Sequence, residues 1–146
     1  DNMDSFVLKI LKILELNGRI TNSELSERVG LSKTPCQIRV KNMIEKGIIK
    51  GFKAVLDNHA LDRNHIAFTE VKLSDTRDSA LNAFNKAVQG IPQIEQCHMI
   101  AGQFDYLLKV RTRNIADYRY ALGEKISSLP CVANTSTHVV MESIKD

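Results

Sequence analysis

The sequence predicts an α+β protein of two domains, and three observations lead to this prediction. The first 56 residues carry apolar side chains at helical spacing in three short segments, which glycine-containing turns separate. After residue 64, extended segments rich in β-branched residues alternate with amphipathic helical segments. The charge also changes along the chain, because residues 1–57 hold ten basic and seven acidic residues whereas residues 58–146 hold ten of each.

Length and composition are those of an ordinary globular protein. The chain has 146 residues, of which 43% are hydrophobic and 25% are charged, so it can bury a hydrophobic core. No apolar run approaches the ~18 residues of a membrane span, and no signal peptide is recognisable. The three cysteines and four histidines are widely spaced and form no metal-ligand pattern. We therefore expect a cytoplasmic protein without membrane contact, disulfide framework, metal site or cofactor.

Two helices are expected in the first thirty residues. Residues 4–16 repeat apolar side chains at helical spacing, and the helix is expected to begin at Asp4 and to stop at Asn17-Gly18. Thr21 or Asn22 then caps a second helix.

A third helix follows after a tight turn at Gly30, where a left-handed backbone costs little. Its N-cap is Ser32 or Thr34, and its end is Gly47. Pro35 fits its first turn, because no N–H partner is missed there. The side expected to be buried contains Cys36, Val40, Met43 and Ile44. The opposite side contains Thr34, Gln37, Ile38, Lys41 and Asn42, with Arg39 on its flank. This pattern is typical of a helix-turn-helix with a basic, hydrogen-bonding outer face.

Basic residues concentrate around the third helix. Between Arg28 and Lys53 the sequence has seven basic residues and one acidic residue, a local net charge of +6. Such a field attracts a phosphate backbone, so double-stranded DNA is the expected partner. The alternative is a solvated amphipathic helix that binds nothing. Residues 48–56 alternate too little for one strand and predict a two-stranded wing with a turn near Lys50-Gly51. Residues 1–56 are therefore expected to form a winged helix-turn-helix domain.

The outer face of the third helix predicts which residues contact DNA. Helix-turn-helix proteins read base edges with the N-terminal half of this helix. Gln37 can pair with adenine, and Lys41 with guanine or phosphate. Ile38 can meet a thymine methyl group or contact the wing. The full set of expected DNA-binding residues is Lys33, Thr34, Pro35, Gln37, Ile38, Arg39, Lys41, Lys50 and Lys53. Among them, Lys33, Arg39, Lys50 and Lys53 are the expected phosphate contacts.

A second domain is expected over residues 65–146, after a polar linker at residues 57–64. Its expected strands are residues 65–73, 94–101, 104–111 and 135–141, and its expected helices are residues 77–89 and 114–129. The order β-α-β-β-α-β is the ferredoxin-like arrangement. Both helices of that arrangement lie on one face of the sheet, so the other face is open. We expect a second copy to cover this face and form a homodimer.

Several motifs occur in one order across the two domains. They are Asn17-Gly18-Arg19-Ile20, the segment Val29–Cys36 followed by Arg39-Val40, Gly102-Gln103-Phe104-Asp105-Tyr106, and Val139–Glu142. Over nearly the whole chain, these motifs resemble those of the Lrp/AsnC family of bacterial and archaeal transcription regulators. The resemblance implies a DNA-binding winged helix joined to an effector-sensing domain. It also implies dimers that assemble further, often to octamers, with amino acids as effectors bound between dimers near the Gly-x-x-Asp-Tyr turn.

Effector binding is expected around that turn. Asp105 can pair with the ammonium group of an amino acid, and backbone N–H groups near Gly102 can hold its carboxylate. The alternative is that Asp105 caps the turn or pairs with Lys109. Met99 and Ala67 are expected to form an apolar wall or to belong to the core. The expected effector-binding residues are Ala67, Met99, Gly102, Gln103, Asp105 and His138, the last as a pH-sensitive polar group.

Two other functions compete with an amino-acid-responsive regulator. Some sirohaem decarboxylases resemble this same two-domain family, but the basic outer face of the third helix and the scattered histidines argue against an enzyme. We therefore expect no catalytic residues. A purely architectural DNA-binding protein is the other alternative, and it would bind random DNA nearly as well as a promoter.

Overall fold

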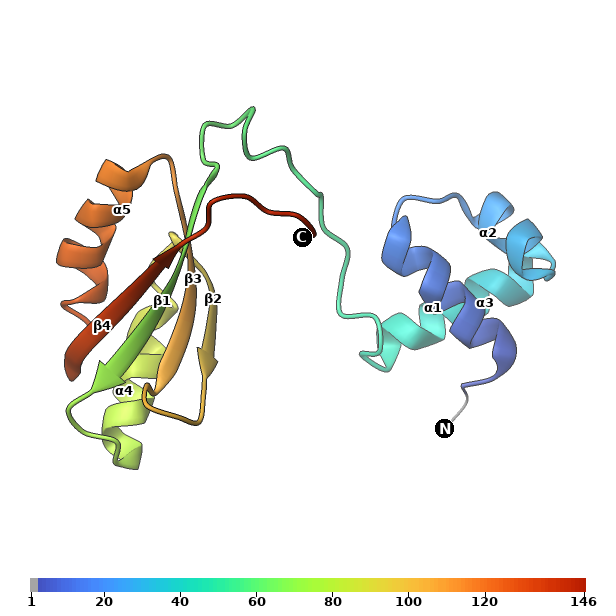
Figure 1. Ribbon diagram of the computed structural model, residues 1–146. Helices are drawn as coiled ribbons and strands as arrows, with labels where there is room; N and C mark the ends of the chain where they lie inside the picture. The colour runs from blue at the N-terminus through green and yellow to red at the C-terminus, as the bar shows by residue number, and fades with distance from the viewer. Residues whose placement is uncertain (1–2) are drawn as a thin grey trace. The chain divides into compact units, whose positions relative to one another are not determined.

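The computed structural model describes residues 3–146 (Figure 1), and the chain divides between Leu56 and Asp57 into two compact units. Each unit has its own hydrophobic core and is described separately. No helix in the described residues is long and apolar enough to cross a membrane.

The first unit is built from α1 (Ser5–Leu16), α2 (Asn22–Val29) and α3 (Lys33–Glu45). Side-chain caps begin two of these helices: Asp4 Oδ1 accepts a hydrogen bond from Val7 N at 2.8 Å, and Thr21 Oγ1 accepts one from Glu24 N at 3.1 Å. Gly30 ends α2 in the left-handed conformation, with φ of 80°. The helices and their caps follow the sequence pattern.

The three helices enclose a small apolar core. Its buried members are Val7, Ile10, Leu25, Val29, Cys36 and Met43. Burial raises the pKa of the Cys36 thiol, so this cysteine behaves as an apolar core residue. Ile44 does not join the core, contrary to the prediction, and its side chain is 47% exposed. At 3.6 residues per turn, Ile44 is rotated about 80° from Cys36, which places it at the edge of the buried face.

The segment after α3 also differs from the prediction. In the described part of the chain, no strand occurs between Glu45 and His65, so the two-stranded hairpin near Lys50-Gly51 is not formed. Instead, the N–H groups of Ile48 and Ile49 donate to the Met43 carbonyl, at 2.9 and 3.2 Å, and close the end of α3. An isolated two-stranded ribbon is marginally stable, and the weak alternation of this segment supplies no apolar face to hold one.

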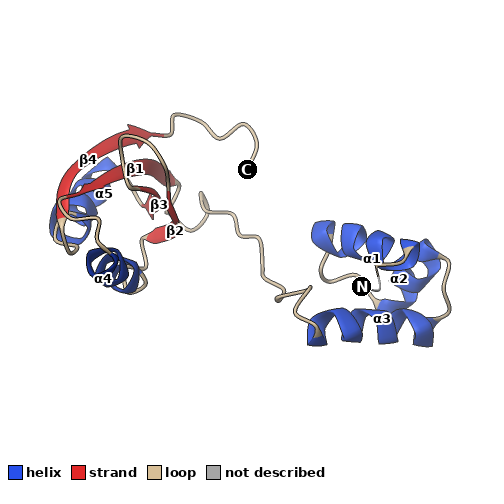
Figure 2. Ribbon diagram, turned by 90° about the horizontal axis from the view of Figure 1, so that it is seen from below, coloured by secondary structure: helices blue, strands red, loops and turns tan. Residues whose placement is uncertain are grey.

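The second unit is a four-stranded antiparallel sheet with helices on one face. Its strands are β1 (His65–Leu73), β2 (Ile94–Met99), β3 (Tyr106–Thr112) and β4 (Val132–Val139), in the spatial order β2-β3-β1-β4. Its helices are α4 (Asp78–Val88) and α5 (Ile115–Ala121), and α5 continues as a π-helical turn, η1 (Leu122–Ile126). Figure 2 shows α4 and α5 on the same side of the sheet. The predicted ferredoxin-like arrangement is confirmed.

The sheet register determines which side chains meet the helices. Thr69 lies opposite Leu108 on β3 and Thr137 on β4, so these residues share the helix-facing side. The buried core on this side includes Phe84 of α4, whose ring centroid is 4.2 Å from that of Tyr106. The neighbouring residues along each strand point to the opposite, uncovered face.

A buried hydroxyl network links the sheet to α5. The Tyr118 hydroxyl lies 2.7 Å from Thr69 Oγ1 and 2.6 Å from Thr137 Oγ1, so one side chain bridges β1 and β4. The Thr69 hydroxyl is fully buried and depends on this partner inside an otherwise apolar layer, whereas Thr137 lies at the exposed end of the network.

Replacing Tyr118 with phenylalanine is expected to destabilise the protein by about 1–3 kcal/mol, because the buried Thr69 hydroxyl loses its partner. Urea unfolding monitored by circular dichroism measures this change. Tyr120→Phe is the matched control, since Tyr120 is 62% exposed on the same helix. Equal unfolding midpoints for the two variants would contradict a stabilising role for the network.

Candidate DNA interface and effector region

The outward face of α3 carries the polar side chains predicted to contact base edges. Thr34, Gln37, Ile38, Lys41 and Asn42 are all exposed, and their spacing places them on one face of the helix. Lys33 is exposed at the start of α3, whereas Pro35 is half-buried in its first turn. Lys50 and Lys53 are exposed in the irregular segment that follows. The structure therefore offers a polar and basic helical surface of the size that enters a major groove.

A hydrogen bond that the sequence did not reveal fixes the turn between α2 and α3. Asn22 Nδ2 donates to the Lys33 carbonyl oxygen at 3.1 Å and joins the first residue of α2 to the first residue of α3. The Asn22 hydrogen bond and the left-handed Gly30, which ends α2, together fix the direction in which α3 leaves the turn. Nothing in the local pattern distinguished this role of Asn22 from helix capping.

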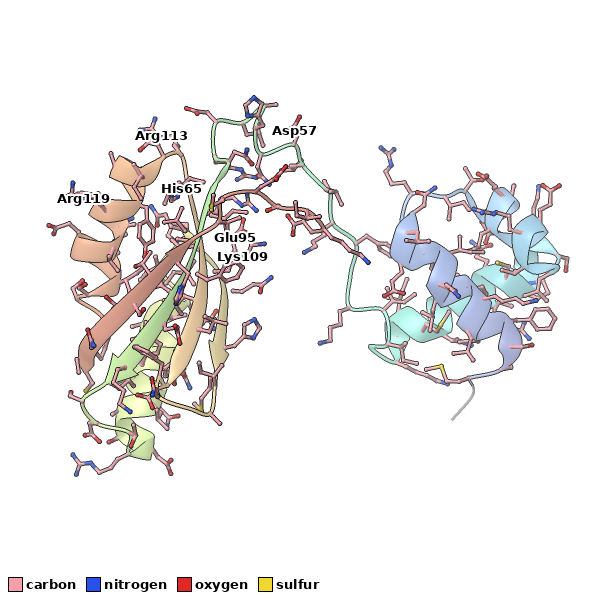
Figure 3. All side chains as sticks on the ribbon, viewed as in Figure 1. Asp57, His65, Glu95, Lys109, Arg113 and Arg119 are labelled. Carbon is pink, nitrogen blue, oxygen red and sulfur yellow. The ribbon has the colours of Figure 1, made fainter. Side chains whose placement is uncertain are left out.

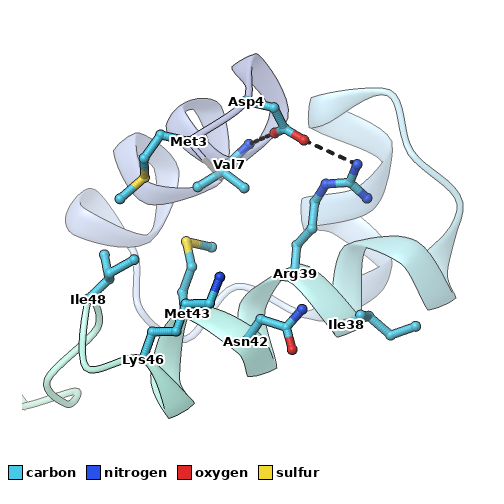
Figure 4. A pocket seen from close by; sticks show the side chains of 9 residues that line it. All are labelled: Met3, Asp4, Val7, Ile38, Arg39, Asn42, Met43, Lys46 and Ile48. Atoms are coloured by element: carbon cyan, nitrogen blue, oxygen red, sulfur yellow. Dashed lines mark hydrogen bonds and ion pairs between the residues drawn. The ribbon is translucent and has the colours of Figure 1, made fainter. Parts of the chain in front are cut away.

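Arg39 lies differently from the other predicted DNA contacts. It is half-buried on the flank of α3, and its Nη2 lies 3.3 Å from Asp4 Oδ2 (Figure 4). The guanidinium carbon also lies 5.4 Å from the centroid of the Phe6 ring. The backbone N–H of Val7 and the Arg39 guanidinium both lower the pKa of Asp4, the former more strongly. Arg39 is thus engaged with α1 inside the first unit.

A hollow of about 520 Å³ flanks the recognition face of α3. Gln37 and Lys41 form part of its wall, and Phe52 lies across from them. A methyl group at Gly18 would approach Phe52 Cδ1 to 2.9 Å, so the glycine makes room for this ring. Gly18 therefore helps to hold the segment that carries Lys50 and Lys53 next to the helices.

Gly18→Ala is expected to displace the Phe52 ring and to destabilise the first unit by at most about 1 kcal/mol, because the ring is 54% exposed and can move away from the added methyl group. Thermal unfolding of the variant measures the loss. Gly51→Ala is the control, since a methyl group there meets nothing within 4 Å. If both variants unfold at the same temperature, the Gly18–Phe52 contact contributes nothing.

The turn between β2 and β3 contains the residues predicted to bind an effector. Gly102 has φ of 142°, a conformation that favours glycine. The Asp105 carboxylate accepts a hydrogen bond from Leu73 N at 2.8 Å, and its Oδ2 lies 3.8 Å from Lys72 Nζ. Asp105 is therefore tied to the end of β1, and its side chain remains 18% exposed.

Asp105 does not pair with Lys109, which was one of the predicted alternatives. Lys109 Nζ lies 3.7 Å from Glu95 Oε1 instead (Figure 3) and at the same distance from Asp146 Oδ1. Residues 105 and 109 are four apart on an extended chain, so they are separated by about 13 Å along the strand direction.

The six predicted effector residues do not gather at one place in a single chain. Met99 is 57% exposed and lines a depression of about 330 Å³ with Asn85 and Tyr106. Ala67 is fully buried in the core beneath the helices. His138 lies on the opposite face of the sheet, where its Nε2 is 2.7 Å from Glu70 Oε1. Strand alternation explains this separation, because Ala67 pairs with Val139 and not with His138.

Within residues 3–146, no group of three or more histidine, cysteine, aspartate or glutamate side chains is placed to hold a metal ion. The three cysteines are unpaired in this part of the chain, and one of them is the buried Cys36.

The chain joins a helix-turn-helix unit, with an exposed polar recognition helix, to a separate α+β unit. This combination is typical of DNA-binding regulators that carry a second domain. Residues 3–50 match the winged helix-turn-helix DNA-binding model, and residues 66–146 match the Lrp/AsnC ligand binding domain. The chain belongs to the Lrp/AsnC family of transcription regulators, and the resemblance seen in the sequence is confirmed.

Named relatives are similar over most of their length. The chain is 61% identical to a proline dehydrogenase transcriptional activator of Rhizobium radiobacter, covering 100% of this chain and 94% of the relative. It is 44% identical to the leucine-responsive regulatory protein of Escherichia coli, covering 99% and 88%. A transcriptional regulator of Neisseria meningitidis, solved in complex with L-Met, has a TM-score of 0.93 at 31% identity and covers 98% of this chain and 92% of its own.

Proposed function

We propose that this transcription regulator reads promoter DNA with α3 and changes its DNA binding when a small amino acid binds its second unit. The observation that carries the proposal is the exposed, polar and basic face of α3, held by the Asn22 hydrogen bond and the Gly30 turn. In this proposal, Gln37 and Lys41 contact base edges, while Lys33, Lys50 and Lys53 contact phosphates.

The target and the effector class are supported by the relatives. The 61% identical relative is named as an activator of proline dehydrogenase, which supports a proline dehydrogenase promoter as the target and proline as the first effector to test. The L-Met complex of the Neisseria meningitidis regulator supports an amino acid as the ligand class. All the named relatives are regulators, which supports a protein without catalytic activity or cofactor that acts in the cytoplasm, where the DNA lies.

We place the effector at the turn between β2 and β3. The Asp105 carboxylate is the anionic partner for an ammonium group, and the open backbone at Gly102 and Gln103 supplies N–H donors. Met99 provides an exposed apolar wall on the same edge of the sheet. Ala67 is too deeply buried to touch a ligand, and His138 reaches the effector only if another copy brings its own sheet face to this edge.

The uncovered sheet face supports a homodimer as part of this proposal. Phe68 and Leu107 are half-buried on the side of the sheet opposite the helices, and they lie among paired charged residues such as Glu70 and Lys109. A second copy would bury these apolar groups, and further assembly of dimers would place several α3 helices along the DNA.

Fluorescence anisotropy on a labelled proline dehydrogenase promoter fragment, compared with scrambled DNA at fixed salt, tests the proposal. We expect tighter binding to the promoter and a change in affinity with proline or another small amino acid. Promoter binding that ignores all twenty amino acids would contradict the effector site. Equal binding to scrambled DNA would favour an architectural DNA-binding protein.

A further inference from the structure

Arg39 is the one member of the predicted DNA-binding set that contacts α1 through its charged group. Its side chain is 30% exposed, and the guanidinium points to the beginning of α1 (Figure 4). There it meets Asp4 Oδ2 at 3.3 Å and lies over the Phe6 ring at 5.4 Å. One cation thus makes two contacts with the first turn of α1. A side chain held in this way has little freedom to reach a phosphate.

Asp4 is held as firmly as its partner. Its Oδ1 accepts the hydrogen bond from Val7 N at 2.8 Å that caps α1, while its Oδ2 meets Arg39. The two oxygens of one carboxylate therefore join the first turn of α1 to the middle of α3. The lowered pKa of Asp4 means that this carboxylate stays ionised to lower pH than an isolated aspartate.

Core packing of α1 and α3, which includes Val7 and Met43, leaves a gap beside it at this end. A hollow of about 440 Å³ lies there, and its walls include Val7, Ile38, Met43 and Ile48 (Figure 4). Where apolar side chains leave space, the distance between two helices depends on the contacts that span it. The Asp4–Arg39 pair is the polar contact of this kind between the two helices.

We propose that Arg39 is a positioning residue, which fixes the recognition helix against α1 and supports sequence-specific binding through that placement and not through a phosphate contact. The inference rests on the proposed reading of DNA by α3. It replaces the phosphate role that the sequence pattern gave to Arg39. A small rotation of α3 misplaces Gln37 and Lys41 relative to base edges, whereas it leaves the basic surface available to any DNA.

Two conservative variants separate the two roles. Asp4→Asn keeps an oxygen that caps α1, because asparagine is as good an N-cap as aspartate, and removes only the charge that pairs with Arg39. Arg39→Lys keeps the positive charge for a phosphate and loses the planar guanidinium. Lys33→Ala is the reference for loss of a phosphate contact. Circular dichroism of each variant establishes that the helices are retained.

The readouts are the dissociation constants for promoter and scrambled DNA and their dependence on salt. For Asp4→Asn and Arg39→Lys we expect promoter binding to weaken by about two- to fivefold, the range of an exposed ion pair. We expect the affinity for scrambled DNA and the dependence of binding on salt to stay unchanged. The double variant should lose no more than either single variant, because both remove one interaction.

Two results would overturn the proposal. A phosphate role predicts that Arg39→Lys binds normally and that Arg39→Ala lowers the salt slope by about one, as expected for Lys33→Ala. Tighter DNA binding by Asp4→Asn would show that Asp4 competes with DNA for Arg39. If the unchanged protein shows no preference for the promoter, the proposed DNA reading itself fails. The role of the Asp4–Arg39 pair in holding α3 against α1 is then tested by unfolding the two single variants and the double variant, whose losses of stability should not add.

Discussion

Replacing Asp105 with asparagine is expected to abolish the response of DNA binding to the amino-acid effector while the fold is retained. The side-chain oxygen of asparagine can still accept the hydrogen bond from Leu73 N, which spans 2.8 Å to the aspartate. The negative charge that we propose as the partner of the ligand's ammonium group is lost. Charge-assisted hydrogen bonds contribute about 1.5–3 kcal/mol, so effector affinity should fall by about 10- to 150-fold.

Asp105→Ala separates the structural role of this carboxylate from binding. The Leu73 N–H then loses its partner, and an unpaired, partly buried donor costs about 1–3 kcal/mol, so this variant should also unfold at lower denaturant concentration. Isothermal titration with proline and urea unfolding measure the two effects. Asp78→Asn, an exposed acid at the start of α4, is the control for loss of one negative charge in the same unit. If Asp105→Asn responds to the effector normally, Asp105 serves only to hold the end of β1.

The local elements of the fold were predictable because their signals are local. Asp4 and Thr21 cap their helices through side-chain bonds, and Gly30 adopts the left-handed conformation that its position predicted. The strand His65–Leu73 begins and ends where its β-branched pattern does. The caps and the Gly30 turn depend on chemistry within four residues, so the local sequence contains their cause, whereas the strand is recognised by its β-branched pattern.

The contacts that join distant residues were not predictable in the same way. Arg39 reads as a surface cation in the sequence, and only the packing of α3 against α1 brings it to Asp4, 35 residues away. Asp105 likewise accepts a hydrogen bond from Leu73 N, which lies 32 residues earlier in the chain at the end of β1. The motif alone did not show that Ala67 and His138 lie on opposite faces of the sheet within one chain, because one step of register moves a side chain to the other face.

Lys41→Ala is expected to separate specific from non-specific DNA binding. Lys41 lies on the exposed face of α3 next to Gln37, and both side chains line a hollow that Phe52 also lines. A side chain that hydrogen-bonds a base edge contributes about 1–3 kcal/mol of discrimination, so promoter binding should weaken by about 5- to 150-fold. Binding to scrambled DNA loses only the charge of one lysine. Alanine has high helix propensity, so α3 itself should not unfold.

Lys33→Ala is the comparison variant for Lys41→Ala, because it removes a proposed phosphate contact and not a base contact. Lys33 is exposed at the first position of α3, and as a phosphate contact it adds the same affinity to every sequence. Its loss should therefore weaken promoter and scrambled DNA equally and lower the salt slope by about one. Anisotropy titrations of both variants at three salt concentrations distinguish the two cases. If Lys41→Ala also weakens both DNAs equally, Lys41 contacts phosphate, and sequence reading by α3 then depends on Gln37 and its polar neighbours.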